Sequence, residues 1–128
     1  MKPELVLLVW AVALTVVQML IAVSGATMQV GPAMLAGNRD NCPAFTGWVA
    51  RAYRAHRNML ENLVLFAALV LIAVASNKTN QTTLLGAQLF VWGRVAYAGV
   101  FLAGIPWLRT GIWLFSMAGL VLIFLQLV

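Results

Sequence analysis

The chain has 128 residues, of which 63% are hydrophobic and only 9% are charged, and its mean hydropathy is +0.96. Soluble domains contain about 25% charged residues, so this composition predicts an integral membrane protein. The formal charge of +5 is carried by residues scattered along apolar segments. That pattern excludes a nucleic-acid-binding protein, whose basic residues form a dense surface run.

Four apolar segments predict an all-α membrane protein, a bundle of four transmembrane helices that forms a single domain over residues 1–128. Each spanning helix needs about 20 apolar residues, so the chain has no room for a separate soluble domain. The expected spans are residues 5–26, 47–75, 84–103 and 107–127.

The longest loop is expected over residues 28–46, where Gly31-Pro32, Gly37 and Pro43 are helix breakers. Thr46 is the expected N-cap of the second span. The single cysteine, Cys42, has no neighbours at metal-ligand spacing, and no metal site is expected.

The basic residues predict how the chain is oriented in the membrane. The side with the 28–46 loop carries five arginines, whereas the other side carries only Lys2 and Lys78. Lys and Arg favour the cytoplasmic side, so this loop is expected in the cytoplasm and both termini opposite. The arginines are Arg39, Arg51, Arg54, Arg57 and Arg109.

The second span carries a polar stripe. Arg54, Arg57, Asn58 and Glu61 are spaced i, i+3, i+4 and i+7, which puts them on one face of a helix. Ionisable groups at membrane depth are costly and normally face a protein interior or a watery cavity. The stripe is therefore either a ligand site or a structural network of ion pairs.

Two neighbours of the stripe favour structural roles. Arg51 lies one turn closer to the loop, and its long side chain is expected to reach the membrane interface. His56 points to another face and is expected to hydrogen-bond a neighbouring helix or the interface.

The third span adds Arg94, Tyr97 and Phe101 at i, i+3 and i+7. Arg94 lies well inside this span. Two interpretations are open for it: a salt bridge with Glu61 or Asp40, or a contact with a ligand.

The fourth span begins with Arg109, Thr110 and Trp113. Arginine binds carboxylates through two parallel hydrogen bonds, Glu61 can accept from an ammonium group, and Asn58 adds neutral donors and acceptors. These residues favour a small zwitterionic ligand with excess negative charge. Glutathione meets that description, as do several other peptides and organic acids.

Two motifs resemble a known family. "RAYRAHRNMLEN" (51–62) and "FVWGRVAY" (90–97) are similar to the second-helix and third-helix signatures of the membrane-associated proteins in eicosanoid and glutathione metabolism (MAPEG). The order of the motifs and the four-span length agree over nearly the whole chain. "GNRDNCPAFTG" (37–47) is typical of bacterial-looking members, which implies a bacterial inner membrane.

The resemblance implies a homotrimer that contacts membrane lipids and binds glutathione between neighbouring subunits, near the cytoplasmic side. One subunit would bind the tripeptide through Arg54, Arg57, Asn58 and Glu61. Its neighbour would contribute Tyr97, Arg109 and Thr110. In catalytic relatives the arginine that matches Arg109 stabilises the glutathione thiolate, and Thr110 would assist it. Arg94 and Trp113 are further candidate ligand-binding residues.

The chain departs from well-studied relatives at three positions. Phe101 and Trp113 stand where those relatives have tyrosines, and Met28 or a neighbour stands where some eicosanoid synthases have an arginine. The resemblance therefore implies a glutathione transferase or peroxidase for lipophilic electrophiles or hydroperoxides, rather than an eicosanoid synthase.

Two alternatives come from other classes of protein. A non-catalytic lipid-binding or scaffolding member would share the fold, but such members lack the arginine-rich stripe that this chain keeps. A small multidrug exporter would have a similar length, but exporters depend on a carboxylate inside the first span. Here that span has only Glu4 at its edge, and Glu61 is the only deep acid.

Overall fold

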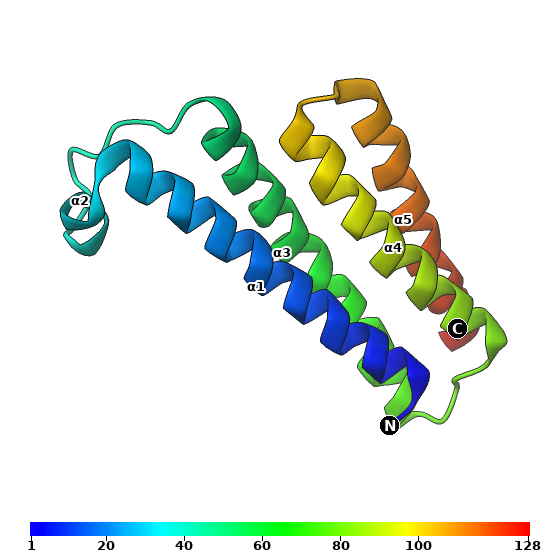
Figure 1. Ribbon diagram of the computed structural model, residues 1–128. Helices are drawn as coiled ribbons and strands as arrows, with labels where there is room; N and C mark the ends of the chain where they lie inside the picture. The colour runs from blue at the N-terminus through cyan, green and yellow to red at the C-terminus, as the bar shows by residue number, and fades with distance from the viewer.

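The computed structural model describes residues 1–128 as an all-helical bundle (Figure 1). Four long helices each have the length and apolar composition to cross a membrane, which confirms the predicted fold class. The N- and C-termini lie at one end of the bundle, and the α4–α5 turn lies at the other. The helices are α1 (Pro3–Val30), α2 (Pro32–Ala36), α3 (Gly47–Ala75), α4 (Gln81–Ala103) and α5 (Pro106–Leu127).

The loop that was expected over residues 28–46 is shorter, because helix continues into its first part. α1 extends to Val30, and the break comes at Gly31, which has a φ of +85°. Pro32 then starts the five-residue α2, where proline at the first turn lacks a donor that the helix does not need. The prediction of a loop was therefore wrong for most of residues 28–36.

The third transmembrane helix begins at Gln81 instead of Leu84, because a capping box fixes its start. The Asn80 side chain accepts a hydrogen bond from the Thr83 amide at 2.9 Å. In return, the Asn80 amide donates to the Thr83 hydroxyl at 2.8 Å. These reciprocal bonds satisfy two backbone donors at the helix start.

Thr46 occupies the N-cap position of α3, but its side chain makes no capping hydrogen bond. The Gln29 side chain pairs with its backbone instead, donating to the Thr46 carbonyl at 2.9 Å and accepting from the Thr46 amide at 3.2 Å. The end of α1 is thereby joined to the start of α3.

A buried carboxylate joins the first and third spans at the end where the termini lie. Glu4 is only 4% exposed, and it accepts a hydrogen bond from the Thr83 hydroxyl at 3.0 Å. The sequence suggested an interfacial position for Glu4. Its burial depends on α4 lying beside α1, which no local pattern indicates.

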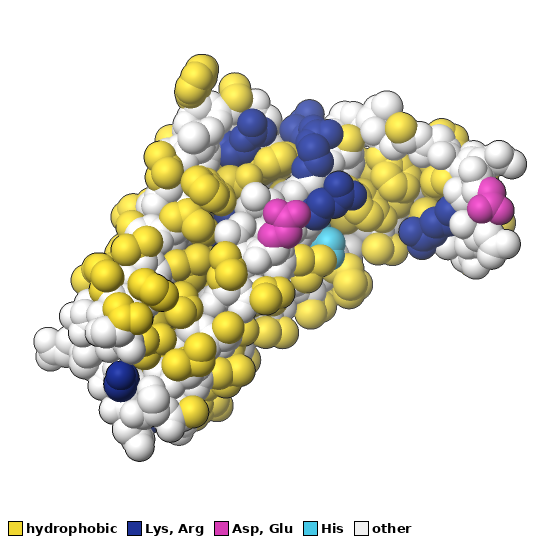
Figure 2. All heavy atoms as spheres, turned by 180° about the vertical axis from the view of Figure 1, so that it is seen from behind, with side chains coloured by type: hydrophobic (Ala, Val, Ile, Leu, Met, Phe, Trp, Pro, Cys, Tyr) yellow, Lys and Arg dark blue, Asp and Glu magenta, His cyan; other side chains and the backbone are white.

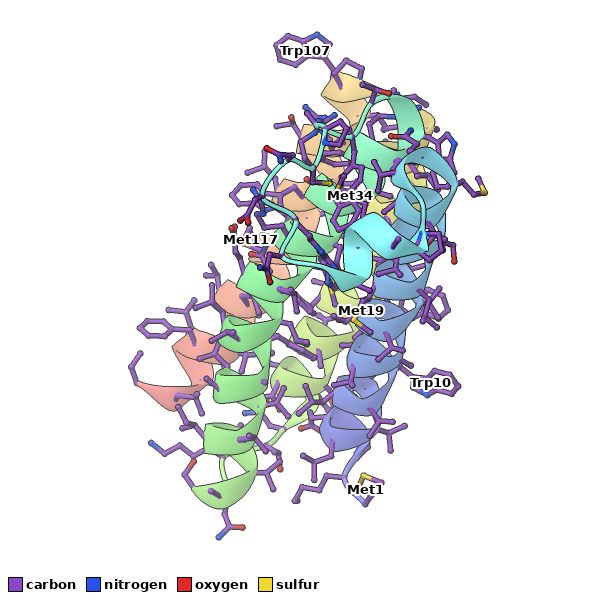
Figure 3. All side chains as sticks on the ribbon, turned by 90° about the vertical axis from the view of Figure 1, so that its left-hand side faces the viewer. Met1, Trp10, Met19, Met34, Trp107 and Met117 are labelled. Carbon is purple, nitrogen blue, oxygen red and sulfur yellow. The ribbon has the colours of Figure 1, made fainter.

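Most of the buried side chains are apolar, and many large apolar side chains are exposed on the outer surface as well. Phe66 and Phe90 stack at the centre of the bundle with their rings 4.2 Å apart. Trp10 and Trp107 project outward from the bundle (Figure 3), and Trp107 is 86% exposed. Tryptophan is enriched at membrane interfaces, where its ring and its N–H group are both accommodated.

α4 and α5 approach closely because small residues face each other across their contact. A Cβ atom added at Gly119 would lie 2.4 Å from the Gly86 carbonyl oxygen, and one added at Gly86 would lie 2.6 Å from the Gly119 oxygen. Gly93 faces Ser116 in the same way, at 3.0 Å. Small residues at such contacts allow the backbones of membrane-spanning helices to approach each other closely.

We therefore expect Gly119→Ala to lower the free energy of unfolding by about 1–3 kcal/mol, because the added methyl group meets backbone atoms that cannot turn aside. Gly111→Ala in the same helix is the matched control, since its Cβ would meet nothing within 4 Å. Thermal unfolding in detergent, followed by circular dichroism, measures both. Equal midpoints for the two variants would contradict the close packing.

Candidate functional site

The candidate site is a cavity of about 160 Å³ between α3, α4 and α5. We call it the basic pocket. α3 contributes one residue, α4 another and the start of α5 the remaining three. Pro106 begins α5, so Arg109 and Thr110 lie in its first turns and face α4. The lining residues are Asn58, Tyr97, Arg109, Thr110 and Trp113. They offer no carboxylate or thiol, so the pocket suits an anion better than a metal cation.

Two guanidinium groups from different helices lie close to the Phe101 ring. The Arg109 Cζ atom is 4.7 Å from the centre of the Phe101 ring, and the Arg54 Cζ atom is 6.0 Å from it. The negative face of an aromatic ring attracts such cations. The Phe101 ring therefore has an electrostatic role as a support for both arginines.

Arg94 is a buried cation without a hydrogen-bond partner. Its side chain is 1% exposed, and none of its three guanidinium nitrogens has a partner. Its Cζ atom lies 4.2 Å from the centre of the Tyr97 ring. The salt bridge with Glu61 or Asp40 that the sequence left open does not form within the subunit. Arg94 therefore lies behind the Tyr97 wall of the basic pocket.

The rest of the stripe on α3 points outward. Figure 2 shows Lys and Arg side chains gathered toward the end of the bundle where α3 begins, with an acidic side chain beside them. Arg54, Arg57 and Glu61 are exposed, and no salt bridge joins them within 4.0 Å. The alternative of an ion-pair network within the subunit is therefore wrong.

Glu61 lies about halfway along the 29-residue α3. A helix of that length is about 43 Å long, so Glu61 falls well inside the membrane. A carboxylate at that depth normally faces protein or a watery cavity. The outward face of α3 at Glu61 is therefore unsuited to contact with lipid.

Arg51 has a different role from the one its sequence position suggests. Instead of extending to the membrane interface, it donates from Nε to the carbonyl oxygen of Leu102 at 3.1 Å. This carbonyl belongs to the last turn of α4, which has no intrahelical donor for it and favours a nearby cation. Arg51 thus joins α3 to the last turn of α4.

His56 does not make the hydrogen bond that was expected with a neighbouring helix. It is half-buried, and its buried Nδ1 atom has no partner within the subunit.

Asn62 is a positioning residue whose role the sequence did not reveal. Its amide nitrogen donates to the Asn58 carbonyl at 2.7 Å and to the Asn58 side-chain oxygen at 3.1 Å. These bonds hold the Asn58 amide at the edge of the basic pocket. The i, i+4 spacing of two asparagines on one helix was the available signal.

A comparison with protein families identifies this fold and these motifs. The family model for the MAPEG family matches residues 5–128. The chain belongs to the MAPEG family. Searches of curated proteins and of solved structures give no match. MAPEG membership covers both motifs of the sequence analysis, and it places the protein in a family of membrane transferases and peroxidases related to glutathione.

The unpaired burial of Arg94 leads to a prediction for the ligand-free MAPEG protein. We expect Arg94→Met to raise the free energy of unfolding by at least about 1 kcal/mol, because it removes a buried charge that lacks a partner and keeps most of the side-chain volume. Thermal unfolding without ligand measures this effect. Arg51→Met is the control and is expected to be destabilising, because it breaks the bond to Leu102. A lower midpoint for Arg94→Met would mean that an anion pairs with Arg94 in the assembly.

Proposed function

We propose that this MAPEG protein is a glutathione transferase or peroxidase that acts on lipophilic electrophiles or hydroperoxides from the bilayer. The observation that carries the proposal is the basic pocket, in which Arg109 and Thr110 face Asn58 and Tyr97. Binding of an anion there is favoured by the surrounding arginines, which have no carboxylate partner within the subunit.

The charges around the pocket suit glutathione. The tripeptide has two carboxylates and one ammonium group, and guanidinium groups bind carboxylates through paired hydrogen bonds. Arg54 and Arg109 both lie close to the Phe101 ring, and Arg94 lies against the Tyr97 ring. Glu61 is free to accept from the ammonium group.

Arg109 is the residue that we assign to catalysis. A free thiol has a pKa of about 8.5, and lowering it to about 6.5–7 requires roughly 2–3 kcal/mol of preferential stabilisation of the thiolate. A guanidinium group about 4 Å from the sulfur supplies up to about 4 kcal/mol in a partly buried site. The Phe101 ring holds the Arg109 guanidinium in place. The Thr110 hydroxyl, which donates to the Pro106 carbonyl at 3.4 Å without ligand, would turn to donate to the sulfur.

The thiolate then attacks the second substrate. In conjugation its electron pair forms a bond to the electrophilic carbon, and the leaving group departs with the electrons of the broken bond. In peroxide reduction the thiolate sulfur attacks one peroxide oxygen, the O–O bond breaks, and the alkoxide takes up a proton and leaves as an alcohol. The sulfenic acid that remains on the sulfur then reacts with a second glutathione thiol, which gives a disulfide and water. An apolar substrate is already concentrated in the bilayer around the helices.

We expect Arg109→Ala to lower the rate of conjugation by about 10²–10³-fold, because one preorganised charge is lost from the reacting sulfur. The ultraviolet absorbance of the thiolate, followed on mixing the protein with glutathione, should be lost as well. Arg39→Ala is the matched control, since Arg39 lies in the exposed loop and bonds only to Leu35. If both variants keep the thiolate signal and the rate, Arg109 is not the activating group.

Thermal unfolding with added glutathione or lipid distinguishes a glutathione-dependent enzyme from a lipid-binding scaffold. A ligand that binds the native state stabilises it by RT ln(1 + [L]/Kd), so even weak glutathione binding raises the thermal midpoint. Stabilisation by lipids together with no stabilisation by millimolar glutathione would favour the non-catalytic alternative.

We further propose that the site is completed across a subunit boundary in a homotrimer. Arg57 and Glu61 are exposed on α3, and charged groups at this depth require a protein or aqueous neighbour. A neighbouring subunit would cover these two side chains. Arg57 and Glu61 of one subunit would then contact the glutathione that is bound by Arg109 of the neighbour.

Mixed trimers test the boundary directly. Glu61→Gln and Arg109→Ala subunits are expected to be inactive alone. When they are co-expressed, some sites would receive Glu61 from one subunit and Arg109 from the other, so activity should partly return. No recovery in trimers shown by tagged pull-down to contain both variants would mean that both residues act within one subunit. Co-expression of Arg109→Ala with itself under two tags is the control.

A further inference from the structure

A second cavity lies on the α1 side of α3 and α4, away from the basic pocket. It has a volume of about 170 Å³ and is formed by three helices. We call it the α1 cavity. Its lining residues are Leu14, Val17, Gln18, Ile21, Ala52, Ala55, Ala98, Gly99 and Leu102. None of them takes part in the proposed chemistry.

Gln18 is the only polar side chain that lines the α1 cavity. It is 7% exposed, and its side-chain oxygen is buried without a hydrogen-bond partner. Buried polar groups are nearly always hydrogen-bonded, and an acceptor left without a donor is unfavourable. The cavity therefore contains one unused hydrogen-bonding group in an otherwise apolar surface.

The size of the cavity comes from the small side chains on α3 and α4. Ala52 and Ala55 leave space on α3, and Ala98 and Gly99 leave space on α4. A cavity of about 150 Å³ accommodates a benzene ring. Val17 and Ile21 on α1 and Gly99 on α4 are exposed, so the cavity opens on the outer surface of the subunit.

The chemistry of the lining excludes most small molecules. No charged side chain lines the cavity, so an anion such as glutathione is unsuited to it. A water molecule normally needs two to four polar partners, and Gln18 is a single one. An apolar molecule with one hydroxyl group can pack against the apolar lining and donate a hydrogen bond to the Gln18 side-chain oxygen.

We propose that the α1 cavity binds a neutral lipophilic molecule about the size of one substituted aromatic ring, whose hydroxyl group donates a hydrogen bond to the side-chain oxygen of Gln18. The site is independent of the proposed glutathione chemistry. Ala55 lines this cavity and also packs against Tyr97 and Phe101. Ala55 alone therefore separates the bound molecule from Tyr97 and Phe101, the aromatic residues beside the basic pocket.

The test uses two photoreactive probes on the full protein in phosphatidylcholine nanodiscs. One is a benzyl alcohol that carries a diazirine on its ring, and the other is the same compound with a methyl group in place of the hydroxymethyl group. After irradiation, peptides are mapped by mass spectrometry. We expect the alcohol to label residues 14–21 and 98–102 about tenfold more than its counterpart does, which is the ratio that one hydrogen bond supplies.

Three variants complete the design. Gln18→Leu should reduce labelling by the alcohol to the level of the counterpart, and Gln88→Leu, at an exposed glutamine on α4, should leave it unchanged. Gly99→Leu should abolish labelling by filling the cavity. A Cβ at Gly99 meets nothing within 4 Å, so this variant is expected to fold. The stabilisation by glutathione should be the same in Gln18→Leu as in the wild type.

Several results would overturn the proposal. Equal labelling by the two probes, or labelling by the alcohol that Gln18→Leu leaves unchanged, would show that the amide does not recognise the hydroxyl. Labelling spread over the exposed helix faces would show partitioning into lipid. A disulfide between subunits in Gln18→Cys, with the wild-type cavity unlabelled, would show that a second copy of the chain covers it.

Discussion

The contact of guanidinium groups with aromatic rings in an apolar bundle is the constraint on which the rest of this structure depends. Charged groups at membrane depth are costly unless protein or water surrounds them. This subunit places three of them against aromatic rings instead of carboxylates. Arg94 lies against the Tyr97 ring, and Arg54 and Arg109 lie close to the Phe101 ring. Aromatic rings attract cations without neutralising them, so the positive charge stays available for an anionic ligand.

The helix contacts serve to hold these cations in one place. Gly86 and Gly119 let α4 and α5 approach backbone to backbone, which brings Arg109 on α5 to Tyr97 on α4. Arg51 joins α3 to the last turn of α4 through the Leu102 carbonyl. Such contacts carry the packing in a membrane, where the hydrophobic effect does not drive helices together. The basic pocket thus depends on close backbone contacts made well away from it.

Much of the fold was predictable because bilayer thickness and helix geometry act locally. Residues 47–75 form α3 as expected, since apolar length sets a spanning helix. The end of α1 was not predictable from breakers alone, because residues 28–30 continue the helix until Gly31. Of the candidate site residues, Asn58, Tyr97, Arg109, Thr110 and Trp113 do meet in one pocket. The partner of Arg94 was not predictable, because helical spacing says nothing about which helix faces which.

By itself, the sequence determined the membrane class, the four helices, the family and the face of α3 that carries Arg54, Arg57, Asn58 and Glu61, because composition and the helical period are local properties. The tertiary structure decided what each charge meets. It buried Glu4 against Thr83 and left Arg94 without an anion. It also left the Gln18 oxygen unpaired at the edge of an apolar cavity. These outcomes depend on how four helices pack together, since a side chain gains or loses its partner only when another helix arrives beside it.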